Sequence, residues 1–292
     1  MMSFFDTIKN IDRRIIFLFI ALSVIIPLLF DVVFPEKLSP IVGKIFTKIE
    51  SLPEGSRVLI SMDYDPSSAP EQQPMVDAII YHCCMLNLRL YIMALWAPGQ
   101  NIATETIKRI IVGYFPEKVY GEDYVHLGYK AGNEGLINVI ITDMKKMYTT
   151  DANGTLIDDI PAMRDVRNLK NMDLIMAFGG GKPGLKEWIL FAGDPGNIPI
   201  AGGVTAVSAP LLYPYYPNQL LGMMGGIKGA AEYEAEMSRH YAGFAQLKHP
   251  GLEMMGPQAV AHVVIMLFII IGNITYFIDR KRQRKEPAGS GK

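Results

Sequence analysis

The chain has 292 residues, 50% of them hydrophobic and 20% charged, with a formal net charge of −1 and a mean hydropathy of +0.19. This apolar content excludes a disordered protein, and the lack of a net positive charge argues against a general nucleic-acid binder. The presence of only two cysteines excludes a disulfide framework and any site that needs four cysteines. Because the mean hydropathy is high for a soluble protein, we expect membrane segments.

The first predicted membrane segment covers residues 15–34 and follows a short N-terminal stretch, residues 1–14. Residues 15–30 read IIFLFIALSVIIPLLF, without a charge, and about 20 apolar residues span the hydrocarbon core of a bilayer. A cleaved signal peptide would end in small residues, but the bulky sequence DVVFP follows this run. We therefore expect an uncleaved signal anchor.

Residues 35–256 are predicted to form an α/β domain, in which strands alternate with helices after an amphipathic helix at 38–50. The expected strands are 57–63, 88–96, 119–127, 173–178 and 198–207, and the expected helices are 71–87, 101–114, 133–148, 183–191 and 218–246. This alternation predicts a Rossmann-like, doubly wound and mainly parallel sheet of about five strands. The strands are continuous apolar runs, as expected when helices cover both faces.

Glycine, proline and polar residues follow each predicted strand, and ligands of such folds bind at the carboxyl ends of the strands. Any strand-to-helix turn also needs these residue types for its geometry, so a purely structural role is the alternative. The ligand-binding candidates are Asp63, Asp65, Lys130, Asn133, Gly180, Gly181, Lys182, Thr205 and Ser208.

The glycine-rich loop over residues 179–184 is the most distinctive of these segments. Its backbone could cradle an anion beside Lys182. It has neither the spacing of a nucleotide P-loop nor the GxGxxG pattern of dinucleotide-binding folds. We favour a conformational turn in which glycine supplies positive φ angles.

Four residues are catalytic candidates: Asp63, Asp65, Lys182 and Ser208. The two aspartates could hold a divalent cation or act as acid and base, although an aspartate that caps the next helix is the alternative. Ser208 could pair with Lys182 or Lys228, but no GxSxG elbow surrounds the serine. We expect no metal site, and the sequence names no cofactor.

Residues 220–231, LLGMMGGIKGAA, concentrate glycine in a predicted helix, where each glycine costs about 1 kcal/mol relative to alanine. Gly222, Gly225, Gly226 and Gly229 would let another element approach closely, either the domain's own sheet or a second protomer. The preceding loop contains Tyr213, Tyr215 and Tyr216, which suit a pocket mouth or an oligomer contact.

The second predicted membrane segment covers residues 257–278, and no charged residue occurs in 259–278. The basic tail, residues 279–292, has five positive charges within residues 280–285, and Lys9, Arg13 and Arg14 precede the first segment. By the positive-inside rule both termini are cytoplasmic, which makes the central domain periplasmic or extracellular. The inverted topology, with a cytoplasmic domain, is the alternative.

These patterns predict a membrane-anchored ligand-binding or scaffolding subunit of a homo-oligomeric membrane assembly. Its expected partners are the lipid bilayer, further copies of the chain and a further membrane subunit, but not nucleic acid. Two tethers raise the local concentration, so weak lateral contacts would be sufficient for assembly. A membrane-tethered hydrolase with its site at the carboxyl ends of the strands is the alternative, since this fold hosts many activities.

Overall fold

The computed structural model describes residues 12–283, which fall into two units. One unit is the α/β domain, residues 35–252, and the other combines the chain before residue 35 with the chain after residue 252. Residues 1–11 of the predicted N-terminal stretch and residues 284–292 of the predicted basic tail lie outside the described residues.

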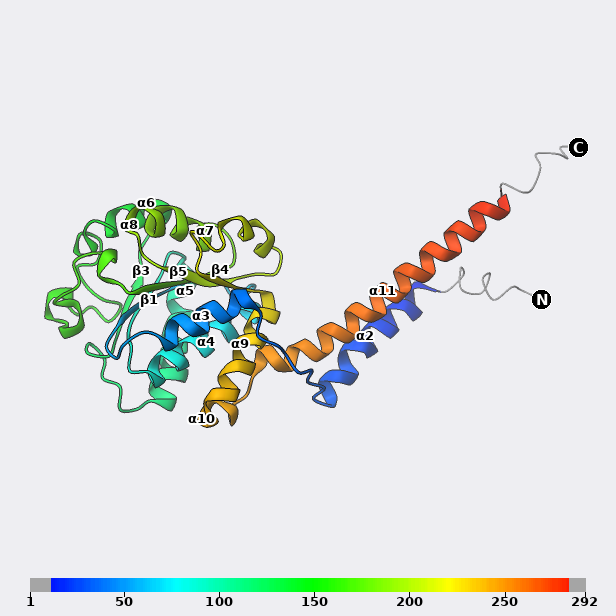
Figure 1. Ribbon diagram of the computed structural model, residues 1–292, viewed down its shortest axis with the longest axis horizontal. Helices are drawn as coiled ribbons and strands as arrows, with labels where there is room; N and C mark the ends of the chain where they lie inside the picture. The colour runs from blue at the N-terminus through cyan, green and yellow to red at the C-terminus, as the bar shows by residue number, and fades with distance from the viewer. Residues whose placement is uncertain (1–11, 284–292) are drawn as a thin grey trace, which may run out of the picture. The chain divides into compact units, whose positions relative to one another are not determined.

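The α/β domain is built on one sheet of six parallel strands, in the order β3-β2-β1-β4-β5-β6 (Figure 1). This order reverses between β1 and β4, as in dinucleotide-binding folds. The predicted parallel α/β fold is confirmed, with six strands in place of about five. The strands are β1 (Arg57–Asp63), β2 (Arg89–Ala94), β3 (Tyr124–Tyr129), β4 (Leu174–Gly179), β5 (Ile200–Val204) and β6 (Gly222–Gly225).

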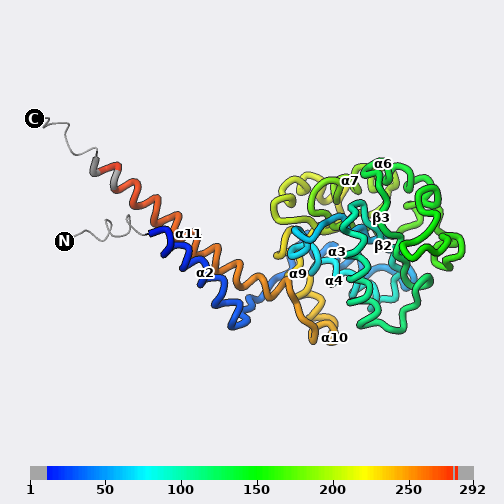
Figure 2. Tube along the Cα trace, turned by 180° about the vertical axis from the view of Figure 1, so that it is seen from behind, coloured from blue at the N-terminus to red at the C-terminus, as the bar shows by residue number. Residues whose placement is uncertain are grey.

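Helices cover both faces of the sheet (Figures 1 and 2). A separate cluster of buried hydrophobic side chains fills the space between the sheet and each helix layer. The strands are therefore buried on both sides, which explains their continuous apolar sequences. One face carries α3 (Pro40–Glu50), α4 (Ala69–Met85), α5 (Ala97–Thr106), α9 (Gly226–His240) and α10 (Ala242–Ala245), and the other carries α6 (Asn133–Ile140), α7 (Leu185–Trp188) and α8 (Asp194–Gly196).

The predicted helix over residues 218–246 is wrong at its start, because β6 occupies Gly222–Gly225 and α9 begins only at Gly226. A Cβ at Gly222 would meet the Ile41 carbonyl oxygen at 2.5 Å, so glycine lets β6 approach α3. Gly226 has a φ of +59° between strand and helix, a conformation that glycine adopts at little cost. The glycines thus mark a strand and a sharp turn.

Two predicted helices change their winding part-way along. α5 continues as a π-helical turn over Ile107–Val112, and α7 continues as another over Ile189–Gly193. A third, expected over 133–148, ends at Ile140 and is followed by a 3-10 turn over Met144–Lys146. π-Helical turns insert one extra residue per turn and occur frequently at functional sites.

The second unit contains α2 (Arg13–Leu29) and most of α11 (Pro250–Gln283). Within α11, Pro250–Ile278 is the one stretch among the described residues that is long and apolar enough to cross a membrane. α2 has 17 residues and is not long and apolar enough to count as a membrane span. The structure therefore supports one of the two predicted membrane spans.

α2 and α11 lie side by side within this unit (Figures 1 and 2). The rings of Phe19 and Phe268 are 6.2 Å apart between centroids. Most large side chains of α2 are nevertheless exposed, with Phe17 at 66% and Leu29 at 73%. An exposed apolar surface of this extent marks a contact with another protein or with a membrane.

Candidate functional site

A pocket of about 320 Å³ opens at the carboxyl ends of β4 and β5. It lies next to the point where the strand order reverses, the usual ligand position in open parallel sheets. Its volume is at the lower end of the range of ligand pockets, roughly 300–1,000 Å³. The lining residues are Gly179, Gly181, Lys182, Leu185, Lys186, Glu187, Val204, Ser208, Leu211 and Leu212.

Several of the predicted ligand-binding residues meet in this pocket. Gly181 and Lys182 reach it from the loop after β4, and Ser208 reaches it from the segment after β5. The buried Thr205 hydroxyl donates to the Ser208 hydroxyl at 3.0 Å. The candidate residues that follow β4 and β5 therefore do lie together, as expected from their positions at the ends of parallel strands.

The positive charge of Lys182 is partly neutralised by two nearby carboxylates. Its Nζ lies 3.7 Å from Glu134 Oε1 and 3.9 Å from Glu187 Oε1, while its side chain is 73% exposed. Lys228, the other lysine considered beside Ser208, bonds instead to Glu36 at 2.9 Å and to Glu232 at 3.2 Å. Of the two lysines considered as partners of Ser208, Lys182 is therefore the one that lines the same pocket.

The glycine-rich loop owes its glycines to close packing. φ is not positive at any glycine within residues 179–184, all of which are described, so the expectation of left-handed turns is wrong. A Cβ at Gly180 would collide with the Ser68 hydroxyl, and one at Gly181 would meet the Trp96 ring at 3.2 Å. The Trp96 indole N–H donates to the Pro183 carbonyl at 2.8 Å. The loops after β1, β2 and β4 therefore pack on one another, and the pocket opens beside β5.

Asp63, at the end of β1, is fully buried, and its carboxylate accepts hydrogen bonds from three groups of the same domain. Its Oδ1 accepts from Ser61 Oγ and from the Leu95 N–H, both at 2.7 Å, and its Oδ2 accepts from Trp188 Nε1 at 2.9 Å. Burial raises the pKa of Asp63 to about 6, with a further contribution from the nearby Glu187 charge, while the three donors oppose this rise. The carboxyl group thus connects β1 to the end of β2 and to α7.

Asp65 has quite different surroundings, although it is only two residues away. Its carboxylate accepts from Ser67 Oγ at 2.7 Å, from the Ser67 N–H at 3.0 Å and from the Ser68 N–H at 3.2 Å. The hydrogen bond from the Ser67 hydroxyl is the main cause that lowers the pKa of Asp65. Asp65 thus organises the turn before α4, which fits the structural alternative considered for it.

Two further candidates lie outside the pocket. Lys130 Nζ lies 5.8 Å from the centroid of the Tyr148 ring, a cation–π distance. Asn133 begins α6 with a φ of +48°, after Gly132. Neither side chain lines the pocket beside β5.

Three residues near the carboxyl ends of the strands are not among the predicted site residues. Glu187 is buried and its Oε2 accepts from the Gly184 N–H at 2.9 Å, which closes the start of α7. Its position three residues after Gly184 is half of a capping-box signal, since Glu187 supplies the acceptor but glycine has no side chain to return the bond. Trp96 and Trp188 are the only tryptophans in the chain and lie at the same edge of the sheet, although nothing in the sequence links them.

The proposed oligomer contacts can also be located. A Cβ at Gly229 would meet the Met224 Cα at 2.6 Å, and one at Gly225 would meet the Ala209 Cβ at 3.1 Å. Packing within the domain thus accounts for these glycines. Tyr213 is 55% exposed, whereas Tyr215 and Tyr216 are half-buried. An intermolecular role for the three tyrosines stays a prediction.

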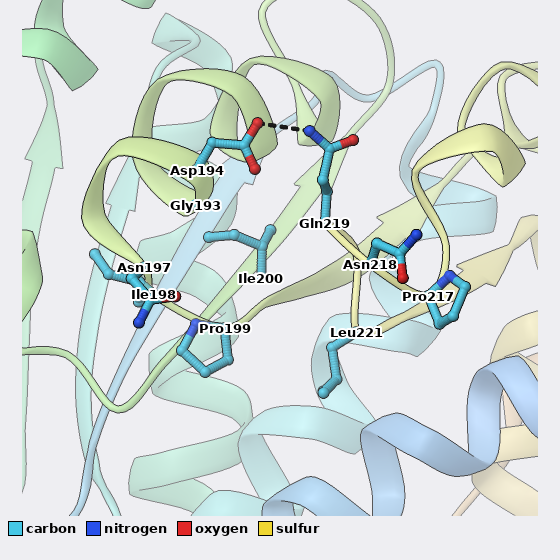
Figure 3. A pocket seen from close by; sticks show the side chains of 10 residues that line it. All are labelled: Gly193, Asp194, Asn197, Ile198, Pro199, Ile200, Pro217, Asn218, Gln219 and Leu221. Carbon is cyan, nitrogen blue, oxygen red and sulfur yellow. Dashed lines mark hydrogen bonds between the residues drawn. The ribbon is translucent and has the colours of Figure 1, made fainter.

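A second pocket, of about 270 Å³, lies at the opposite edge of the sheet, near the amino ends of β5 and β6 (Figure 3). Asp194 and Gln219 point toward one another there and form a hydrogen bond of 2.6 Å. Two of its polar side chains therefore satisfy each other. Because ligands of this fold bind at the carboxyl ends, the pocket beside β5 is the stronger candidate.

No protein-family model matches the chain, and no curated protein matches it. Function therefore has to be argued from the geometry of the site.

Proposed function

We propose that this protein is a membrane-anchored ligand-binding protein whose α/β domain holds a small amphipathic ligand in the pocket beside β5. The observation that carries the proposal is the combination of a pocket at the carboxyl ends of β4 and β5 with both apolar walls and cationic groups. Leu185, Val204 and Leu212 form apolar walls, and Lys182 and Lys186 lie beside them. Such a lining suits a molecule with an apolar body and an anionic group.

Hydrolysis, the second candidate, has less support from the same residues. A nucleophilic serine needs a base within hydrogen-bond reach. Within residues 12–283, the hydrogen-bond partner of the Ser208 hydroxyl is the Thr205 hydroxyl, which is no base. Asp63 is fully buried and bonded to three donors. Binding therefore fits the pocket better than catalysis.

Blocking the pocket with Ser208→Trp is expected to remove a ligand that co-purifies with the wild-type protein. The indole would occupy much of a volume of about 320 Å³. The measurement is mass spectrometry of the small molecules released by denaturing the full chain, purified in detergent. The matched control is Val207→Trp, because Val207 is 86% exposed and does not line the pocket.

The control protein should release the same molecule as wild type, in about the same molar ratio. Equal release from both variants would contradict the proposed site, and so would the absence of any released molecule from the wild-type protein. Turnover of the released molecule by wild type, abolished by Ser208→Ala, would favour the hydrolase instead.

We further propose that α2 enters the bilayer beside α11, with both termini cytoplasmic and the α/β domain on the opposite side. Support comes from the exposed apolar side chains of α2, from its ring contact with α11 and from the basic residues that flank both helices. Arg13 and Arg14 begin α2, and Arg280 and Lys281 lie near the described end of α11. Positive charge on the same side of two spans is typical of cytoplasmic ends.

Cysteine labelling tests this topology directly, since the native Cys83 and Cys84 are buried. Ser67 is exposed in the α/β domain, and Lys281 is exposed near the end of α11. A membrane-impermeant maleimide should label Ser67→Cys in intact cells and Lys281→Cys only after lysis. The reverse pattern would establish a cytoplasmic domain, and labelling of both in intact cells would contradict two spans.

A further inference from the structure

We infer that a separate pocket of the α/β domain binds a phosphate group, supplied by the headgroup of an anionic membrane phospholipid. The pocket has a volume of about 290 Å³ and lies between α4, the π-helical turn after α5 and the segment from α9 to α11. It shares no lining residue with the pocket beside β5. Its chemistry comes chiefly from Asp77, Tyr81, Arg109, Tyr114, Phe244 and Lys248.

Aromatic rings form the apolar walls of this pocket. The Tyr81 ring lies edge-on to Phe244 at 5.0 Å and to Tyr114 at 6.0 Å, measured between centroids. Tyr114 is 47% exposed, so one wall is accessible from solvent. Tyrosine combines an apolar ring with a polar hydroxyl and is enriched at the level of lipid headgroups.

Arg109 is held in position in this pocket by the half-buried carboxylate of Asp77. Its Nη2 donates to Asp77 Oδ1 at 2.9 Å, and its Nη1 donates to Asp77 Oδ2. Asp77 also accepts from Gln73 Nε2 at 2.7 Å, and Gln73 in turn accepts from the Tyr64 hydroxyl at 2.9 Å. Because Arg109 is 46% exposed and has further N–H groups, it can bind an anion without rearrangement.

The pocket lining has two carboxylates, Asp77 and Glu234, and two cationic groups, Arg109 and Lys248, so its formal charge is zero. Glu234 accepts from the Gly251 N–H at 3.2 Å and from the Leu252 N–H at 2.9 Å, so its carboxylate faces the amino end of α11. Asp77 is paired with Arg109. Lys248 is exposed and forms no ion pair with any residue in the range 12–283. An incoming phosphate would therefore meet two cationic groups.

The chain connection to the membrane helix favours a lipid as the source of the phosphate. Pro250 lines the pocket and is also the first residue of α11, within the stretch apolar enough to cross a membrane. Ala259, where the uncharged run begins, follows nine residues later. At 1.5 Å per residue this separation is about 14 Å along a helix. A basic residue near an anionic membrane surface is attracted to the lipid headgroups.

The test is native mass spectrometry of the full chain in detergent, titrated with phosphatidylglycerol. Lys248→Glu is expected to weaken lipid binding by about tenfold, since it reverses one of the two cations. The matched control is Lys108→Glu, which makes the same charge change at an exposed residue that does not line the pocket. Tyr114→Ala, which removes one wall, should also weaken binding.

A second arm replaces the lipid with inorganic phosphate at about 10 mM and measures thermal stability. If the lipid binds and Lys248→Glu alone of the two charge variants weakens it, a lipid headgroup is the ligand. If only inorganic phosphate stabilises the protein, and Lys248→Glu abolishes this effect, the phosphate site is upheld with a soluble source. Equal effects of Lys248→Glu and Lys108→Glu, or binding of neither probe, would overturn the inference.

Discussion

Replacing Asp63 with alanine is expected to lower the free energy of unfolding of the α/β domain by about 3 kcal/mol or more. The substitution would leave the Ser61 hydroxyl, the Leu95 N–H and the Trp188 indole N–H without their acceptor inside the protein. Each buried donor left unsatisfied costs about 1–3 kcal/mol. Relief of the desolvated carboxylate, whose pKa is raised to about 6, offsets part of this loss.

Urea unfolding of the full chain in detergent, followed by tryptophan fluorescence, measures this effect. Both tryptophans of the chain lie at this edge of the domain, so the signal reports on the region that changes. Asp65→Ala is the control, because Asp65 organises a turn at the surface and its loss should cost much less than the loss of Asp63. Similar losses for the two variants would show that the buried network contributes little.

The same residue predicts a pH dependence with a definite sign. The folded pKa of Asp63 is about 6, whereas the ordinary pKa of an aspartate is about 3.9, so the folded state binds the extra proton between these values. Its contribution to stability is therefore fully present below about pH 4, and falls by about 3 kcal/mol as the pH rises to about 6. Subtracting the Asp63→Asn profile from the wild-type profile isolates this contribution. A difference that stays constant between pH 4 and 6 would contradict it.

Gly202→Ala is expected to destabilise the domain by about 3 kcal/mol, because overpacking against a rigid neighbour forces backbone to move. Gly202 is buried in β5, and a Cβ there would collide with the carbonyl oxygen of Ala177 on the neighbouring β4. A backbone oxygen inside a parallel sheet cannot move without disturbing the ladder of hydrogen bonds. Urea unfolding of the full chain measures this loss.

Gly203→Ala is the matched control, since it makes the same substitution at the next residue of the same strand. A Cβ at Gly203 would collide with Met75 Sδ and would lie 2.8 Å from the Phe178 ring. A methionine side chain adapts more readily than backbone, so this variant should lose about 1 kcal/mol. If Gly203→Ala proved the more destabilising variant, β5 would be seated differently in the sheet.

The sequence by itself determined the elements whose burial is uniform. β1 is predicted with its observed bounds, Arg57–Asp63, because both faces of that strand are covered and its central residues form an apolar run. The alternation of strands and helices likewise identified a parallel sheet, since parallel strands require crossovers. The membrane-crossing stretch of α11 is recognisable because no charge interrupts its apolar run.

Only the tertiary structure decided the features that depend on which segments meet. β6 reads as a glycine-rich piece of helix until α3 is seen packed against Gly222, since glycine has no side chain to reveal its partner. Asp63, the last residue of β1, and Asp65, two residues later, look alike in sequence, but Trp188, 125 residues from Asp63, bonds only to Asp63. The need for glycine at positions 180 and 181 is likewise visible only once Ser68 and Trp96 are packed against the loop. The local sequence pattern indicates whether a residue is buried. A binding site, in contrast, depends on contacts between the ends of different strands, which form only when the chain folds.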